Sequence, residues 1–483
     1  MLFNSFAFLV LVTMTFTLYY TPILRRHQIE ILITASIVFY SWSSLYFLLL
    51  LIISALINAL SSYFVFYGES PARSRLVAVS GVVANLSVLT MFKYGKLIYT
   101  SFFADILGTH GVGALIVSLP LPIGISFYTF QGISLVVDSF RKDIGIDTKV
   151  DGSKRAFFLK HTKKSFFFII FFPHSVSGPI VKSKDFLPQC GEKRFSSIDW
   201  ENVFRLIVIG YFLKSVVADN LKEHLIFITY PYFQSSSSLT LIVMLFGYSF
   251  QIFADFAGYS SIAIGIAALF GYRLCMNFNY PYISRSFAEF WRRWHMSLSS
   301  WLRDYLYIPL GGNKKGKARV YLNLMIVMFL GGLWHGAAWS YAIWGAFHGI
   351  ALAIERLFVS DPLKESSNRV ISVLRMLLVF VFVSFAWLLF RLPNYHEAFM
   401  YLRAIFENIN LKNQITVIMC IFIFSAPVVV YHLIYLARTG FFGDTRFYKE
   451  ALFPIFLQRY EYLIYGMMLF LLAVNSGVTG EFI

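Results

Sequence analysis

Long apolar runs separated by short polar stretches dominate the chain. A helix needs about 20 mostly apolar residues to cross a bilayer, and a backbone in lipid must satisfy its own hydrogen bonds, which favours helices. The runs with this character are 4–22, 30–66, 76–100, 113–140, 165–181, 202–218, 240–270, 320–335, 339–358, 370–392, 414–437 and 459–478. The pattern predicts an all-α polytopic membrane protein that forms a single membrane-embedded domain over residues 1–483.

Several of these runs are expected to be irregular. Run 30–66 is too long for one crossing and is predicted to bend near Ser41–Ser44. Prolines and glycines interrupt the chain at Leu119–Pro122 and within 165–181, so re-entrant or broken segments are predicted there. The first run, Phe6–Tyr20, follows no basic segment and has no clear small-residue cleavage site, which favours a retained span. About 11 crossings are expected in total.

Composition supports a lipid environment. Hydrophobic residues make up 58% of the chain and charged residues only 14%, whereas about 25% is typical of soluble domains. So few charges cannot cover a water-exposed surface. The three cysteines, Cys190, Cys275 and Cys420, lie far apart, so the sequence predicts neither a disulfide framework nor a metal site.

Charge then suggests an orientation. Lys and Arg number 41 against 25 Asp and Glu, a net charge of +16, and they gather in short loops such as Lys154–Lys164 and Arg292–Arg319. Because no basic stripe lies on a soluble domain, a nucleic-acid partner is not expected. Basic loops are retained on the cytoplasmic side of membranes, so both termini are predicted to lie outside.

An amphipathic segment precedes the last spans. On a helix, Phe290, Trp291, Trp294, Leu298, Trp301, Leu302 and Tyr305 share one arc, opposite Arg292, Arg293, Ser299, Ser300 and Arg303. This predicts an interfacial helix with tryptophans at headgroup level, and it places His295 at the edge of the apolar arc. Either this is a membrane-surface helix with a histidine at its boundary, or that edge faces a cavity where His295 does chemistry. The loop 309–316 is read as solvated, with binding of a phosphate-bearing donor as the less favoured alternative.

Two histidines lie within apolar runs. The pairs Gly332/Gly336 and Gly345/Gly349 have the small-xxx-small spacing that permits close helix packing. An ionisable ring at this depth is a functional candidate by default, and a neutral imidazole can accept a hydroxyl proton near pH 7. His335 is the stronger candidate, although a structural role stays open for it. His348, close to Trp344 and Phe347, is read as a packed histidine.

Two further polar residues lie in apolar surroundings. Asp255 must be paired or line a wet cavity, and an ion pair or structural hydrogen bond is the favoured interpretation. His174 lies in a segment broken by glycine and proline that is expected to line the same cavity as the other histidines.

Together these residues resemble the membrane-bound O-acyltransferase superfamily, and within it the bacterial alginate O-acetylation branch. The resemblance rests on Leu121–Tyr128, Asp255–Phe256 with Gly258–Ser260, Glu289–His295, Trp301–Tyr305, Gly311–Asn313 and Leu330–Gly336. These motifs cover about residues 120–350, which would form the catalytic core.

The resemblance implies that His335 is the essential histidine and His295 a second active-site residue. Asp255, Arg303, Asp304 and His174 are possible supporting residues. It also implies spans around a central tunnel in a bacterial inner membrane, with no metal and no tightly bound cofactor. Acetyl-CoA would be the acyl donor, and a periplasmic SGNH-type acetyltransferase would be a partner. The acceptor would be an extracellular polysaccharide such as alginate or cellulose.

Two alternatives remain open. One is a D-alanyl or other acyl transferase for a wall polymer. The other is a small-solute transporter whose broken spans, Asp255 and histidines form a solute path, although no inverted repeat stands out in the sequence.

The topology can be tested directly. A cysteine placed at Lys315, in the basic loop Lys314–Lys317, should react with an impermeant label only from the cytoplasmic side, because that loop carries retained positive charge. Labelling of this cysteine only from outside would contradict the predicted orientation.

Overall fold

The computed structural model describes residues 1, 3–103, 112–145, 153–176, 178–359, 368–439 and 460–475. In these ranges the chain is helical and contains no strand, as predicted. Its internal contacts divide it into two compact units. The first comprises Met1–Arg205 and Ile262–Cys275, and the second Leu206–Ser261 and Met276–Ile483. The single domain over 1–483 stays a prediction.

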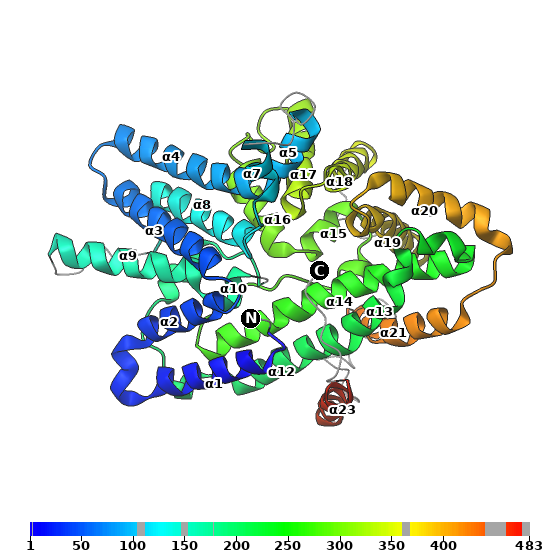
Figure 1. The fold of residues 1–483 in the computed structure, drawn as a ribbon, viewed down its shortest axis with the longest axis horizontal. Coiled ribbons are helices and arrows are strands. Elements are labelled where there is room, and N and C mark those ends of the chain that lie inside the picture. The colour runs from blue at the N-terminus through cyan, green and yellow to red at the C-terminus, as the bar shows by residue number, and fades with distance from the viewer. Residues whose placement is uncertain are drawn as a thin grey trace. The chain divides into compact units, whose positions relative to one another are not determined.

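Helices (α) and 3₁₀ or π turns (η) follow one another along both units (Figure 1). The first unit contains α1 (Phe6–Tyr20), η1 (Pro22–His27), α2 (Gln28–Ser41), α3 (Leu45–Tyr67), α4 (Pro71–Leu89), η2 (Thr90–Tyr94), α5 (Gly95–Phe102), α7 (Val112–Ser118), α8 (Ile125–Arg141), α9 (Lys154–Ile170), α10 (Phe172–Ser175), α11 (Ser183–Phe186), η3 (Leu187–Gln189) and η4 (Phe195–Ser197). The second contains η5 (Phe212–Ala218), α13 (Asp219–His224), η6 (Leu225–Ile228), η7 (Tyr232–Ser235), η8 (Pro281–Ile283), α15 (Phe287–Arg293), α16 (Met296–Leu302), η9 (Arg303–Tyr307), α17 (Lys317–His335), α18 (Trp339–Phe358), α19 (Arg369–Arg391), α20 (Tyr395–Glu407), η10 (Asn408–Asn410), α21 (Ile415–Arg438) and α23 (Glu461–Val474). Two helices, α12 (Trp200–Tyr211) and α14 (Ser238–Leu269), have residues in both units.

The predicted interruptions are confirmed. Helix α2 ends at Ser41 and α3 begins at Leu45. The proline-containing stretch after Ser118 separates α7 from α8, which begins at Ile125. Run 165–181 is also broken, because α9 ends at Ile170 and is followed only by the four-residue α10. Proline residues therefore follow the ends of α7 and α9, as the sequence predicts.

Fewer helices qualify as spans than were expected. In the described ranges six are long and apolar enough to cross a membrane: α3, α4 with α5, α14, α17, α19 and α21. Helix α1 and the segment Pro22–Ser41 pass the same criterion together but are bent by 101°, which gives up to seven. The count of about 11 crossings stays a prediction.

Polar pairs join the helices of the first unit. Helices α3, α4, α8 and α9 lie side by side (Figure 1). The amides of Asn58 on α3 and Asn85 on α4 donate to each other's oxygens over 3.1 and 2.7 Å, and Ser62 Oγ of α3 lies 2.8 Å from His161 Nε2 of α9. Hydrogen bonds of this kind associate helices where lipid offers no polar alternative.

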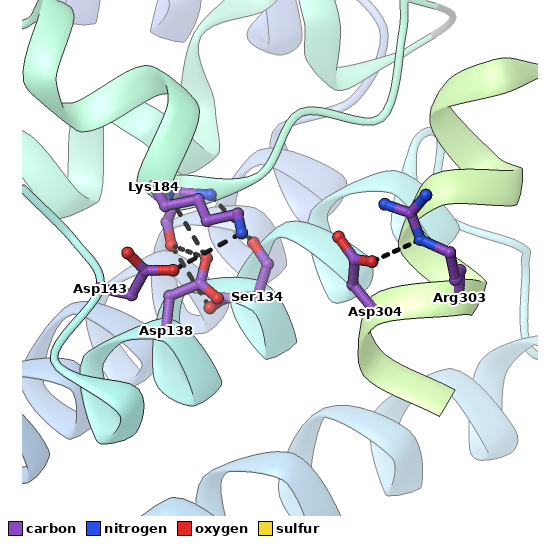
Figure 2. Close-up of polar contacts among 7 residues, drawn as sticks. Ser134, Asp138, Asp143, Lys184, Arg303 and Asp304 are labelled. Atoms are coloured by element: carbon purple, nitrogen blue, oxygen red, sulfur yellow. Dashed lines mark hydrogen bonds and ion pairs between the residues drawn. The ribbon is translucent and has the colours of Figure 1, made fainter. Parts of the chain in front are cut away.

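A second polar contact ties the segment after α10 to the end of α8. The carboxylate of Asp138, fully buried, accepts a hydrogen bond from Ser183 Oγ over 2.8 Å. Lys184 forms an ion pair with Asp143 at 3.5 Å, just beyond α8 (Figure 2).

In the second unit, α17 and α18 pack as a close antiparallel pair. A Cβ on Gly332 would lie 2.3 Å from the Tyr341 carbonyl oxygen, and one on Gly345 would lie 2.3 Å from that of Met328. Because neither distance admits a side chain, only glycine permits this approach. The prediction of close packing at the small-xxx-small positions is confirmed.

The predicted interfacial helix is wrong in two respects. It is not continuous, because α15 ends at Arg293 and α16 begins at Met296. Its apolar arc also faces protein: Phe290, Trp294 and Trp301 are buried in the second unit. An amphipathic projection shows which side of a segment is covered, but it cannot distinguish lipid from protein as the cover.

The α17–α18 contact generates a stability prediction. Gly345→Ala should lower the free energy of unfolding by at least about 1–3 kcal/mol, because the added methyl group forces the helices apart. Thermal denaturation of the detergent-solubilised protein would measure this. Gly466→Ala is the matched control, since it also lies in a helix but a Cβ there would meet nothing within 4 Å. Equal melting temperatures for Gly345→Ala and the wild type would contradict the packing.

Candidate active site

The start of α15 is held by side-chain caps. Ser286, the N-cap residue, accepts a hydrogen bond at Oγ from the Glu289 backbone N–H over 2.9 Å. The two carboxylate oxygens of Glu355, on α18, accept from the backbone N–H groups of Phe287 and Ala288 over 2.8 and 2.9 Å. These bonds attach α15 to α18 and determine where the chain enters the next turn.

That turn is made by His295. It is the N-cap of α16 and has φ +43°, a left-handed conformation that is uncommon for a residue with a side chain. The imidazole is fully buried, edge-on to Phe256 of α14 at 4.6 Å and 5.9 Å from Trp334. The prediction that it sits at the edge of an apolar arc is therefore wrong, because the projection assumed one continuous helix. Burial lowers the pKa of His295 to about 3, so the ring is neutral at pH 7.

One edge of the His295 ring is hydrogen-bonded. Its Nδ1 lies 3.2 Å from Asn277 Oδ1 and 3.5 Å from Ser297 Oγ. The same Asn277 oxygen accepts from Ser297 Oγ over 2.7 Å, and the Asn277 amide nitrogen donates to Ser260 Oγ over 3.0 Å. The other ring nitrogen, Nε2, is buried and has no hydrogen-bond partner among the described residues.

His335 lies at the C-terminal end of α17, beside His295. The two imidazole centroids are 6.2 Å apart. Three aromatic rings border His335, those of Trp334, Trp344 and Phe390, at 5.0 to 5.3 Å. Its side chain remains half-buried. The structure thus brings together the two histidines that were predicted as catalytic, in a setting lined by aromatic rings.

His348 lies one aromatic ring further away. It is fully buried against Trp344, at 4.8 Å between centroids, and against Trp291 at 5.2 Å. Neither ring nitrogen has a hydrogen-bond partner among the described residues. The prediction that His348 is packed among aromatic rings is confirmed.

Asp255 is part of a buried ion cluster. The Lys214 ammonium lies 2.7 Å from Asp255 Oδ1 and 2.6 Å from Asp219 Oδ1, and all three side chains are at most 4% exposed. The expectation that Asp255 is paired is confirmed. Phe256, the next residue on α14, contacts His295, so the cluster anchors the helix that borders the histidine.

The remaining predicted residues have other neighbours. Arg303 and Asp304 form an ion pair with each other at 2.8 Å in the π-helical turn η9 (Figure 2). His174 belongs to the first unit, where it is fully buried and its Nε2 lies 2.8 Å from the Phe168 carbonyl oxygen. Supporting roles for these three residues stay predictions.

Sequence reasoning missed three residues of this region. Lys214 and Asp219 lie in or beside an apolar run, so the rule that flagged Asp255 could have found them. Asn277 carried no comparable signal, because asparagine is common in the polar stretches between helices. No group of three metal-ligating side chains occurs in the part of the chain that the structure describes.

Comparisons with known proteins give one matching family model and several relatives. Residues 161–390, which include both histidines, match the model of MBOAT, the membrane-bound O-acyltransferase family. The chain is 35% identical over 415 residues to the probable alginate O-acetylase AlgI of Pseudomonas aeruginosa, covering 84% of this chain and 75% of that protein.

The names of two other relatives refer to different polymers. The peptidoglycan O-acetyltransferase of Helicobacter pylori is 35% identical over 390 residues, with 77% of this chain and 72% of that protein covered. The teichoic acid D-alanyltransferase of Bacillus subtilis is 29% identical over 289 residues, with 57% and 70% covered.

The buried ion cluster generates a stability prediction. Lys214→Met should lower the free energy of unfolding by about 3–5 kcal/mol, because it leaves two buried carboxylates without their cation. The readout is thermal denaturation in detergent. Lys412→Met, at an exposed position of the same unit, is the matched control and should have little effect. Adding Asp219→Asn and Asp255→Asn to Lys214→Met should recover part of the loss, and a triple variant less stable than Lys214→Met would contradict the electrostatic origin.

Proposed function

Because the chain belongs to the membrane-bound O-acyltransferase family and is an O-acyltransferase, we propose that it transfers acetyl groups for the O-acetylation of an extracellular polysaccharide. Acetyl-CoA on the cytoplasmic side is the proposed donor. A periplasmic SGNH-type acetyltransferase is the proposed partner where transfer is relayed, and the bacterial inner membrane is the proposed location. Relatives named for alginate and peptidoglycan acetylation support acetyl as the group and a polymer as the final acceptor.

The observation that carries the proposal is the pair of imidazoles, 6.2 Å apart among aromatic rings. Acyl transfer to a hydroxyl needs a group that takes the hydroxyl proton while the oxygen attacks the acyl carbon. The proton must then pass to the leaving thiolate, because a thioester donor releases its thiol as the new ester forms. A neutral imidazole can do both.

His335 is the proposed base. Its ring is half-buried, whereas that of His295 is fully buried, so His335 is the more accessible of the two imidazoles. The proposed role of His295 is to position the reacting groups. The alternative is that His335 carries the acyl group transiently, as a covalent acyl-histidine.

D-alanyl transfer to a wall polymer is the second candidate function, supported by the relatedness to the teichoic acid D-alanyltransferase. It uses the same pair of histidines and differs in the acyl group delivered. Mass spectrometry and NMR of surface polymers from a deletion strain would distinguish the two, because an acetyl ester and a D-alanyl ester differ in mass.

Substitution of the histidines tests the assignment. His335→Ala and His335→Gln should both reach the membrane in normal amounts but lower acyl transfer by about 10²–10⁴-fold, because neither side chain can remove the proton. His295→Ala should be strongly impaired with traces of activity left, and His348→Ala should keep most activity. The readout is the acyl content of the polymer, normalised to the protein in the membrane fraction.

His396→Ala is the control for histidine removal, since that ring is exposed on α20, and it should leave acylation unchanged. Near-normal acylation with His335→Ala would overturn the catalytic assignment.

A further inference from the structure

The hydrogen bonds around Asn277 determine which nitrogen of His295 carries the proton. The Ser297 backbone N–H lies 3.3 Å from one terminal atom of the Asn277 side chain. A backbone N–H can only donate, so that atom is the amide oxygen. Ser260 Oγ, which accepts from the opposite terminal atom over 3.0 Å, is consistent with the same orientation. The orientation of the asparagine amide is therefore settled by a donor that has no alternative role.

The tautomer of His295 follows from that orientation. An amide oxygen can only accept, so the His295 Nδ1 that faces it at 3.2 Å must carry a hydrogen. The second neighbour of Nδ1 agrees, because Ser297 uses its hydroxyl hydrogen on the same amide oxygen at 2.7 Å and has only lone pairs left for the ring at 3.5 Å. In a neutral imidazole the other nitrogen, Nε2, then bears the lone pair.

We propose that Asn277 is a positioning residue that holds His295 as the Nδ1–H tautomer, so that Nε2 accepts a hydrogen bond from a hydroxyl group of the acyl acceptor. This nitrogen is buried and has no partner among the described residues. A hydroxyl oxygen makes hydrogen bonds of about 2.7–3.0 Å, and the two imidazole centroids are 6.2 Å apart, so in this proposal one acceptor hydroxyl lies within reach of both rings. His295 therefore cannot donate to the carbonyl oxygen of the donor from Nε2, and its role is to bind and orient the acceptor. The inference rests on the proposed O-acyl transfer.

The tautomer itself can be measured without any substrate. Full-length protein with ¹⁵N-labelled histidine, reconstituted in lipid, would be studied by solid-state NMR, in which protonated and unprotonated ring nitrogens resonate far apart. Comparison with His295→Gln assigns the His295 signals among the ten histidines. The expected result at pH 7 is a protonated Nδ1 and an unprotonated Nε2. A protonated Nε2 would overturn the proposal.

Activity measurements then separate positioning from mere stability. In vesicles that contain the full-length protein, with acetyl-CoA and alginate oligosaccharides as probes, Asn277→Leu should lower transfer by about 10–100-fold at every pH, as loss of an orienting partner typically does. Asn277→Asp keeps the acceptor, but its carboxylate stabilises the imidazolium and raises the pKa of His295. On acidification its activity should therefore begin to fall at a higher pH than that of the wild type, and it should recover toward neutral pH and above, because Nε2 regains its lone pair there.

Among the described residues, the charged groups near His295 already have ionic partners. His335 is the titratable group in ring contact with it, Glu289 pairs with Arg293 on α15, and Asp255 pairs with Lys214 beside α14. Asn279→Asp is the matched control, since it makes the same substitution two residues away at an exposed position and should leave the pH profile unchanged. Equal, pH-independent losses in Asn277→Leu and Asn277→Asp would show a purely structural role. An Nδ1–H tautomer in a protein that leaves the polysaccharide unacetylated would refute the proposed acceptor but not the tautomer.

Discussion

The contact between the backbones of α17 and α18 determines where the central histidine lies. A Cβ on Gly332 or Gly345 would overlap a carbonyl oxygen of the facing helix, so the two helices meet at a separation that only glycine allows. His335 follows Gly332 by three residues and Trp344 precedes Gly345 by one, so this approach brings the imidazole to 5.3 Å from the indole. In lipid, helices associate through such packing because there is no hydrophobic driving force between them. The position of His335 therefore derives from the fit of two backbones.

His295 is positioned differently, by the left-handed conformation of its own backbone. That conformation costs a side-chain-bearing residue of the order of 1–3 kcal/mol and persists only where its surroundings enforce it. Here the Asn277 carbonyl oxygen accepts from the Met296 backbone N–H over 2.9 Å, while the Asn277 amide holds the ring. One residue thus supports both the backbone turn and the imidazole orientation. Substituting Asn277 therefore affects the geometry of the site even though its side chain contacts Nδ1, on the opposite edge of the ring from Nε2.

Sequence patterns predict the parts of this protein that depend on local chemistry. Proline and glycine mark the ends of α7 and α9, glycine spacing indicates the α17–α18 contact, and an aspartate in an apolar run implies a buried cation. They fail where a long-range contact decides the outcome. The turn at His295 depends on Asn277, 18 residues earlier, and a helical projection extended through it places the ring on the wrong surface. Likewise, the arc of Phe290 and Trp294 is apolar because protein covers it, which periodicity cannot distinguish from lipid.

Helix α14 connects the ion cluster to the active site, so a loss of activity on substitution of Asp255 can have two causes. Phe256 and Ser260 are four residues apart and so lie on one face of the helix, where one contacts the His295 ring and the other holds the Asn277 amide. Asp255 directly precedes Phe256 on this helix, and its carboxylate forms an ion pair with the Lys214 ammonium. Removing that ion pair leaves a buried charge uncompensated, and any displacement of α14 that relieves it would move Phe256 and Ser260 together. Loss of activity in an Asp255 variant is therefore no proof that the carboxylate takes part in chemistry. A displaced α14, whose Phe256 and Ser260 no longer contact His295 and Asn277, would cause the same loss. A variant that restores the charge balance without restoring the carboxylate separates this structural explanation from a chemical role of Asp255.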